Sequence, residues 1–342
     1  MDLYNPTPLT ALLYRHRNAA GVAEGCCIAK ATYRIEMESC RRVQLTQVEA
    51  ELVTADVGSQ EDPDCPWRLS EICPPKVATD VLFPGLVARS RWGRSQRSWN
   101  VELEVGSLSK TLVVTGQRYA TRSLLGWNVE MIQPTDAVVV SYSNAYGGQA
   151  YNDVGDVLDF VPENPVGRGV ELGTNRSFRP QRVLLPQVGA GPELIRNPLR
   201  YRQVVGVGPV PRAWSPRREL AGTFGTSWAQ DRAPLMPPDF TDKFYSESSD
   251  GLRFDGFAMG NELVRMSGVH PEGVVAFQLP ANFEVGLLLR SNSGSTLFAH
   301  MQLDTISIDL SGAQLDLIWR ASFPRDGQEW EGALGLFPTE RG

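Results

Sequence analysis

The 342-residue sequence lacks the features that identify membrane, exported or nucleic-acid-binding proteins. No apolar run approaches the roughly 18 residues that predict a transmembrane helix. The first residues, MDLYNPTPLTALLYRHRNAAG, have no basic start followed by an apolar stretch, unlike a secretory signal. The formal net charge is -6, and acidic and basic residues are mixed along the chain, which argues against phosphate-driven binding of nucleic acid. We therefore expect a cytoplasmic protein that binds neither membranes nor nucleic acid.

Metal ligands and disulfide partners are also scarce. The five cysteines are an odd number in a chain without an export signal, which argues against a disulfide framework. Cys65 and Cys73 have seven residues between them, more than the roughly two to four of zinc motifs, and His16 is the only histidine in the same half of the chain. The adjacent Cys26 and Cys27 begin an apolar, strand-like run. The sequence thus predicts structural thiols, with no metal and no cofactor.

Recognisable catalytic motifs are missing as well. The chain has only three histidines and no Gly-x-Ser-x-Gly nucleophile motif. The lone Gly-x-Gly at 206–208 is followed by prolines, so no helix begins there to bind a phosphate. Asp153, Asp156 and Asp159 are spaced three apart, without the alternate spacing and closing glutamate of a calcium loop. We expect a protein that is not an enzyme.

Turn residues, by contrast, are abundant. The 32 glycines and 24 prolines are spread along the chain and interrupt helices, which favours short strands joined by turns. Residues 99–105 alternate between apolar and polar side chains and lead through a short turn into 110–115, which predicts a β-hairpin. Further strand candidates are residues 26–35, 137–142, 201–207, 274–279, 284–290, 304–310 and 315–323, and the helix candidates are 226–232 and 239–245. We predict an all-β fold of mainly antiparallel sheets, sandwich- or barrel-like, with long loops and few short helices.

Two lobes are the predicted domain organisation. A boundary near Pro134 gives an N-terminal β lobe of residues 1–135 and a C-terminal β lobe of residues 136–342 with long aromatic and arginine-rich loops. One integrated domain is the alternative. Residues 147–200 and 206–250 contain more loop than compact domains usually do, and long ordered loops are usually functional surfaces.

These loops concentrate tryptophan, tyrosine, phenylalanine and arginine. Such side chains are enriched at interface hot spots because they bury a large area and still offer polar groups. The candidate partner-binding residues are Tyr146, Arg168, Arg212, Trp214, Arg217, Trp228, Arg232, Phe240 and Tyr245. The alternative is that the loops fold back onto their own sheet, held by arginines that stack on aromatic rings or bond to backbone carbonyls.

Several short motifs occur in a definite order along the chain. A Tyr-Gly-Gly block at 146–148 precedes Asn-Pro-Val-Gly-Arg-Gly at 164–169. A Trp…Arg-Ala-Pro element at 228–234 then leads into Pro-Asp-Phe at 238–240. On the flanks, CIAKATYRI and PPKVATDVLFPG precede this block, and an Asp-Thr step and a Trp-Arg pair follow it. Taken together over residues 20–325, these motifs resemble a family of uncharacterised proteins encoded beside type VI secretion genes, whose members look like effector adaptors or chaperones.

The resemblance implies a non-catalytic adaptor that holds a toxic effector and helps place it on the VgrG/PAAR spike of a bacterial type VI secretion system. Its partners would be the secreted effector and the spike protein. The glycines would permit close backbone approach, and the Asn-Pro step would form a turn. The motif residues expected to be structural are Gly147, Gly148, Asn164, Pro165, Gly167, Gly169, Pro234, Asp239, Asp304, Trp319 and Arg320.

Two other functions are weighed against the adaptor. The protein could instead be a structural component of the secretion machine that assembles into a ring or sheath. It could also be a hydrolase that uses carboxylates such as Asp239 or Glu262, for which the long ordered loops are the only support.

Overall fold

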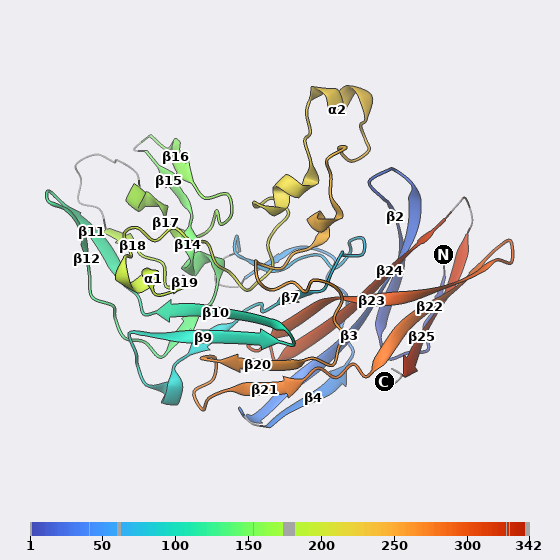
Figure 1. Ribbon diagram of the computed structural model, residues 1–342, viewed down its shortest axis with the longest axis horizontal. Coiled ribbons are helices and arrows are strands. Elements are labelled where there is room, and N and C mark those ends of the chain that lie inside the picture. Colours follow the sequence, from blue (N-terminus) through green and yellow to red (C-terminus); the bar gives the residue numbers. More distant parts are fainter. Residues whose placement is uncertain are drawn as a thin grey trace.

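The computed structural model describes residues 2–40, 42–59, 63–152, 154–173, 182–325, 327 and 329–338. Strands make up 45% of the structure and helices 9%, so the predicted all-β fold is confirmed. Most strands belong to two sheets, with irregular segments and a projecting arm on one side of them (Figure 1). Asp153, one of the loop acids weighed as a metal ligand, lies outside the described residues.

The larger sheet has nine strands and curls into a nearly closed barrel. Most neighbours are antiparallel, but the β1–β25 and β7–β23 pairs are parallel. Strand β3 is buried along 25–33, because both of its faces are covered. The order is β1 (Leu3–Tyr4), β25 (Trp330–Pro338), β22 (Phe283–Ser291), β23 (Thr296–Asp309), β24 (Gln314–Pro324), β3 (Ala23–Ser39) and β2 (Thr10–Arg17), with β4 (Arg42–Val48) beside β3 and β7 (Asp80–Leu82) beside β23.

The second sheet has five strands and contains the predicted hairpin. Its order is β19 (Val188–Gly189), β10 (Leu108–Thr115), β9 (Ser98–Val105), β20 (Leu263–Ser267) and β21 (Val275–Gln278). Strands β9 and β10 pair antiparallel, which confirms the hairpin. Val101, Leu103 and Val105 are each at most 1% exposed, while Asn100 and Glu102, which alternate with them along the strand, are exposed. The alternating pattern therefore marks the buried face correctly.

Short elements occupy the remaining chain. The smaller sheets comprise β12 (Gly126–Val129), β11 (Tyr119–Ser123) and β18 (Arg182–Leu184); β13 (Ala137–Val139) and β8 (Val87–Arg89); β14 (Tyr146–Gly147) and β17 (Arg168–Gly169); β15 (Gln149–Tyr151) and β16 (Val157–Phe160); and β5 (Val57–Gly58) and β6 (Pro66–Arg68). The helices are α1 (Glu193–Arg196) and α2 (Thr226–Asp231), with 3₁₀ turns η1 (Arg91–Gly93), η2 (Tyr142–Asn144), η3 (Val170–Gly173), η4 (Arg217–Ala221) and η5 (Asp242–Tyr245). Within the described ranges, no helix has the length and apolar character needed to span a membrane.

Two predicted elements are wrong. Residues 201–207 form an irregular segment rather than a strand. Isolated backbone hydrogen bonds, such as that from the Phe83 N–H to the Val207 carbonyl (2.8 Å), join this segment to the core. The apolar pattern of the segment arises from burial without sheet pairing. Of the predicted helix at 239–245, only the short turn η5 forms. Asp239, at its start, accepts hydrogen bonds from Thr223 instead.

Both main sheets contain strands from before and after the expected lobe boundary at residue 135. The nine-stranded sheet joins β1–β4 and β7 to β22–β25, and the five-stranded sheet joins β9 and β10 to β19–β21. One cluster of buried apolar side chains extends through strands on both sides of the boundary. The two halves of the chain therefore share their sheets and their core.

Charged side chains from the flanking motifs are buried on the outer face of the barrel, beneath the segment before β7. The Arg320 guanidinium donates to Asp304 from the neighbouring strand, and both residues are at most 2% exposed. The Lys76 ammonium lies 2.8 Å from carboxylate oxygens of both Asp80 and Glu247. Burial alone would lower the pKa of Lys76, but these two carboxylates raise it above its ordinary value. The motif charges are thus paired inside the fold.

A second buried group lies on strand β3. The Lys30 ammonium is 2.8 Å from Glu71 and 3.7 Å from Asp316, while the Thr32 hydroxyl donates to Asp316 at 2.7 Å. Burial raises the pKa of Glu71, and Lys30 opposes that rise. The group ties the segment before β7, which contains Glu71, to the barrel wall.

Candidate protein-interaction surface

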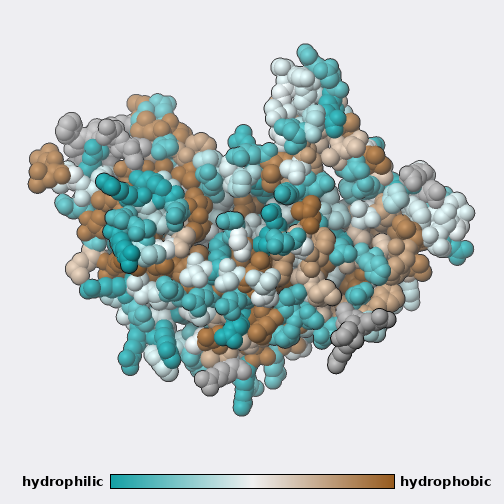
Figure 2. Space-filling view, viewed as in Figure 1, coloured by the Kyte–Doolittle hydropathy of each residue, from teal (hydrophilic) through white to brown (hydrophobic). Residues whose placement is uncertain are grey.

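An arm formed by 222–240 projects from the body of the protein with helix α2 near its end (Figure 1). Figure 2 shows the arm projecting beyond the surrounding surface. Its base is closed by Thr223, whose N–H and hydroxyl donate to the Asp239 carboxylate at 3.0 and 2.7 Å. These two bonds hold the pKa of Asp239 below its ordinary value. Gly222 has φ of 84° there, and a Cβ atom would lie 2.7 Å from Asp239, so glycine is required.

Aromatic packing stiffens the arm. The Phe224 and Trp228 rings meet edge to face with centroids 4.8 Å apart. The Trp228 indole N–H donates to the Leu235 carbonyl at 2.7 Å, and the Arg232 guanidinium donates to the Met236 carbonyl. Trp228 is half-buried by these contacts, whereas Phe224 is 54% exposed. The arm thus presents Phe224 on a preorganised support.

The arm rests against the turn between β2 and β3. Arg232 donates to the Ala19 carbonyl at 3.4 Å, and the Leu235 side chain packs onto Gly21. A Cβ atom at Gly21 would lie 2.4 Å from a Leu235 methyl group, and φ at this position is 83°. A cavity of about 520 Å³ lies along the arm, lined by residues that include Ser227 and Asp231.

Three aromatic rings form the root of the arm. Phe240, Phe244 and Tyr245 have pairwise ring-centroid distances of 5.7–5.9 Å in tilted, edge-directed arrangements. The Arg217 guanidinium lies 5.6 Å from the Phe244 ring and donates to the Phe244 and Val210 carbonyls at 2.8 and 2.6 Å. Burial lowers the pKa of Arg217. The buried Arg217 guanidinium therefore holds the segments that contain Val210 and Phe244 together.

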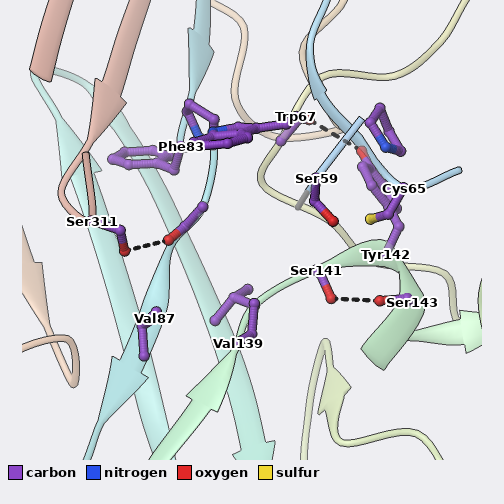
Figure 3. Close-up of a pocket in the computed structure, with 15 residues that line it drawn as sticks. Ser59, Cys65, Trp67, Phe83, Val87, Val139, Ser141, Tyr142, Ser143 and Ser311 are labelled. Atoms are coloured by element: carbon purple, nitrogen blue, oxygen red, sulfur yellow. Dashed lines mark hydrogen bonds between the residues drawn. The ribbon is translucent and has the colours of Figure 1, made fainter. Parts of the chain in front are cut away.

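Beside this root, Trp214 is buried against Tyr142 and Cys65. The Trp214 and Tyr142 rings pack at 87° with centroids 5.1 Å apart. Next to them lies a cavity of about 220 Å³, shown in Figure 3. Its rim carries two hydroxyl contacts, Ser141 with Ser143 at 2.9 Å and Ser311 with the Gly85 carbonyl at 2.6 Å. The cavity is too small for a ligand much larger than one side chain.

The glycine-rich block surrounds a single buried amide. The Asn164 side chain is fully buried and donates to the Tyr142 and Tyr146 carbonyls at 2.8 and 2.9 Å. A Cβ atom at Gly147 would lie 2.2 Å from the Asn164 carbonyl oxygen, and one at Gly148 would lie 2.4 Å from the Gly167 carbonyl oxygen. The glycines therefore provide close backbone approach.

The remaining motif residues also contact the chain itself. Gly169 has φ of 96°, and Arg168 beside it donates to the Ser143 carbonyl at 2.6 Å. Trp319 is buried in the barrel, where its ring lies 5.7 Å from that of Phe283. Pro165 follows Asn164 in the same turn, and Pro234 lies in the arm after a cis peptide bond.

The nine candidate partner-binding residues divide by exposure. Tyr146, Trp214 and Arg217 are buried in the protein; Arg168, Trp228, Arg232, Phe240 and Tyr245 are half-buried; and Arg212 is exposed. Four of them, Trp228, Arg232, Phe240 and Tyr245, come together along the arm and its root. Backbone carbonyls accept bonds from Arg168, Arg217 and Arg232, as the loop-folding alternative expects. Their roles toward a partner stay predictions.

Exposed apolar residues that the sequence argument did not select form a second surface. The β11–β12 turn carries Leu124 and Leu125, which are 94% and 101% exposed. The β15–β16 hairpin, at the same end of the molecule in Figure 1, exposes Val154, Leu158 and Phe160, and Figure 2 shows apolar surface at this end. The paired leucines of a hairpin turn were the available sequence signal, because turns seldom carry apolar residues without a contact to make.

The two carboxylates weighed as hydrolase groups have local roles. Asp239 closes the base of the arm, as described above. Glu262 accepts bonds from the Met259 and Gly260 N–H groups at 2.6 and 2.9 Å. Each carboxylate therefore organises its own loop.

The model of a family described as "Uncharacterized protein conserved in bacteria (DUF2169)" matches residues 20–320. No curated protein and no solved structure matches the chain.

Proposed function

Because this chain belongs to the DUF2169 family of uncharacterized bacterial proteins, we propose for it the role of a non-catalytic adaptor or chaperone in type VI secretion. It would bind a toxic effector in the cytoplasm and help load that effector onto the VgrG/PAAR spike. The order of sequence motifs supports this choice of pathway, and the surface of the protein supports the choice of a binding role.

The observation that carries the proposal is the presence of two separated projecting surfaces. One is the arm of 222–240 with the exposed Phe224, and the other is the hairpin end with Leu124 and Leu125. An adaptor needs contacts to two partners, an effector and a spike protein. Exposed apolar groups on preorganised supports give affinity at a low ordering cost.

The charged groups support a non-catalytic role. Asp304 and Arg320 are paired on the buried outer face of the barrel, and Asp239 and Glu262 accept bonds from their own loops. Each of these carboxylates is thus engaged by a group of the protein itself. The hydrogen bonds of Asp239 and Glu262 order their own loops, so an active site is not needed to explain why these loops are ordered.

Co-purification tests the proposal. The tagged chain is expressed with the products of its neighbouring genes, and the recovered proteins are identified by mass spectrometry. We expect stoichiometric recovery of a toxin-like protein or a spike protein, and loss of one partner when 223–239 is replaced by a short linker. Recovery of the chain alone would contradict the adaptor role and favour a search for catalytic activity.

A further inference from the structure

A cysteine, a histidine and a glutamate from distant parts of the sequence meet at one end of the two main sheets. Cys40 lies in the turn between β3 and β4, and His270 and Glu272 lie in the turn between β20 and β21. One potential ligand atom of each residue lies within 4.8 Å of the other two. Among the residues that the structure describes, no other group of three such side chains has this arrangement.

We infer that Cys40, His270 and Glu272 form a binding site for one Zn²⁺ ion. Thiolate, imidazole and carboxylate are the three side-chain ligands that zinc accepts, and a thiolate disfavours Mg²⁺ and Ca²⁺. Zinc bonds of about 2.0–2.3 Å place tetrahedral ligand atoms about 3.4 Å apart. The side chains therefore need to approach by roughly 1 Å, which small rotations provide.

Hydrogen bonds already orient the three residues toward one another. The Cys40 N–H donates to the Glu272 carboxylate at 3.4 Å, and the Glu272 N–H donates to the His270 Nδ1 atom at 3.3 Å. The Gly273 N–H donates to the His270 carbonyl at 3.2 Å and closes the turn. Because Cys40 is only 4% exposed, its thiol stays on the inner side of the group.

A cavity of about 370 Å³ leaves room for a fourth ligand. It is lined by the three residues together with Arg89 and Arg91. Three protein ligands and an open position are the arrangement in which zinc binds water or a group from another molecule. Bound zinc would also link the β3–β4 turn of the barrel to the β20–β21 turn of the second sheet. Because zinc would bind this site only in the folded state, it would raise the stability of the protein.

Zinc titration of the chain without a histidine tag, in a reducing buffer, tests this site. We expect one Zn²⁺ per chain in competition with a chromophoric chelator, and a thiolate-to-metal absorption band when Co²⁺ is used as the probe. Cys40→Ser, His270→Gln and Glu272→Gln should each weaken zinc binding by more than about 100-fold. Cys40→Ser should also remove the Co²⁺ band.

His300→Gln is the matched control, because His300 Nδ1 lies 3.6 Å from the Glu284 carboxylate in an exposed histidine–carboxylate pair. This variant should bind zinc like the unmodified chain. Circular dichroism checks the fold of each variant, and His270→Gln, in a partly exposed turn, serves if Cys40→Ser does not fold. A chain that binds no zinc stoichiometrically, or a His270→Gln variant with unchanged affinity, would overturn the site.

Discussion

At the scale of single residues, the buried outer face of the barrel depends on the pairing of its charges. Asp304 accepts from the Arg320 guanidinium, the Lys76 N–H and the Thr305 hydroxyl. Arg320 donates in addition to the Glu71 carbonyl at 2.7 Å. A buried pair of this kind contributes little relative to an apolar pair, but removal of one partner leaves an uncompensated buried charge.

We therefore expect Asp304→Ala to lower the free energy of unfolding by about 3–5 kcal/mol, measured by urea denaturation. Glu130→Ala is the matched control, since Glu130 forms an exposed carboxylate–guanidinium pair with Arg182 at 2.9 Å. Its loss should lower the stability far less than the loss of Asp304, because water screens an exposed ion pair. Equal effects of the two substitutions would contradict the account of the buried pair.

Lys110 gives a prediction for pH. Its ammonium donates to the Ser249 hydroxyl at 3.1 Å and to the Asp250 carbonyl at 2.5 Å. Burial lowers the pKa of Lys110 to about 8, although Asp250 partly opposes this shift. The unfolded chain, with an ordinary lysine pKa, then binds more protons than the folded chain between about pH 8 and pH 10.5, so the Lys110 contribution to stability rises with pH there.

Unfolding by denaturant at about pH 7.5 and about pH 9.5 measures this contribution, with Lys110→Met as the comparison. The unmodified chain should gain more stability over this interval than the variant, by at most about 1.4 kcal/mol per pH unit. Equal gains in the two proteins would show that Lys110 titrates at its ordinary pKa.

At the scale of elements, the arm combines a closed base with a stiff aromatic interior. Thr223 and Asp239 close the base, and Phe224 packs edge to face against Trp228. The Arg232 guanidinium, which donates to the Ala19 carbonyl, and the Leu235 side chain, which packs onto Gly21, join the arm to the barrel. Loss of exposed arm residues should therefore affect a partner more than it affects the fold.

Phe224→Ala is expected to weaken binding of the captured partner by at least about tenfold, as for an aromatic hot spot. The same change should lower the free energy of unfolding by less than about 1.5 kcal/mol, because only the ring contact with Trp228 is lost. Calorimetry of binding and of thermal unfolding provides the two values. Phe257→Ala, at a position 39% exposed on the body, should leave binding unchanged. If the two variants bind equally well, the arm is not the contact surface.

Elements with local patterns were predictable from the sequence, and those that depend on distant contacts were not. Alternation identified the β9–β10 hairpin, and prolines placed α2 within one residue of its end. Residues 201–207 have a strand-like composition, yet burial explains it without pairing. Of the candidate partner-binding residues, Trp228 and Phe240 lie on the arm and its root, whereas side-chain composition could not show that Trp214 faces inward. The approach of Cys40 to His270 depends on the packing of two different sheets against each other, which spacing rules do not detect.

At the scale of the whole molecule, shared sheets make the two halves one support for the arm and the hairpin end. The nine-stranded sheet joins the first and last strands of the described chain, β1 and β25, in a parallel pair. The two candidate contact surfaces are thus held at fixed positions on one body. This arrangement suits a protein that holds two partners at once, with each interface burying roughly 1,500 Å².

Light scattering coupled to size-exclusion chromatography tests this central claim most directly. The chain is measured alone over a wide concentration range and then mixed with the partner recovered by co-purification. The adaptor account predicts a chain of constant, small size and a discrete complex of one partner with one or two copies of the chain. Growth of the chain alone into large assemblies would instead indicate a structural component of the secretion machine, and separate elution of chain and partner would contradict the adaptor role.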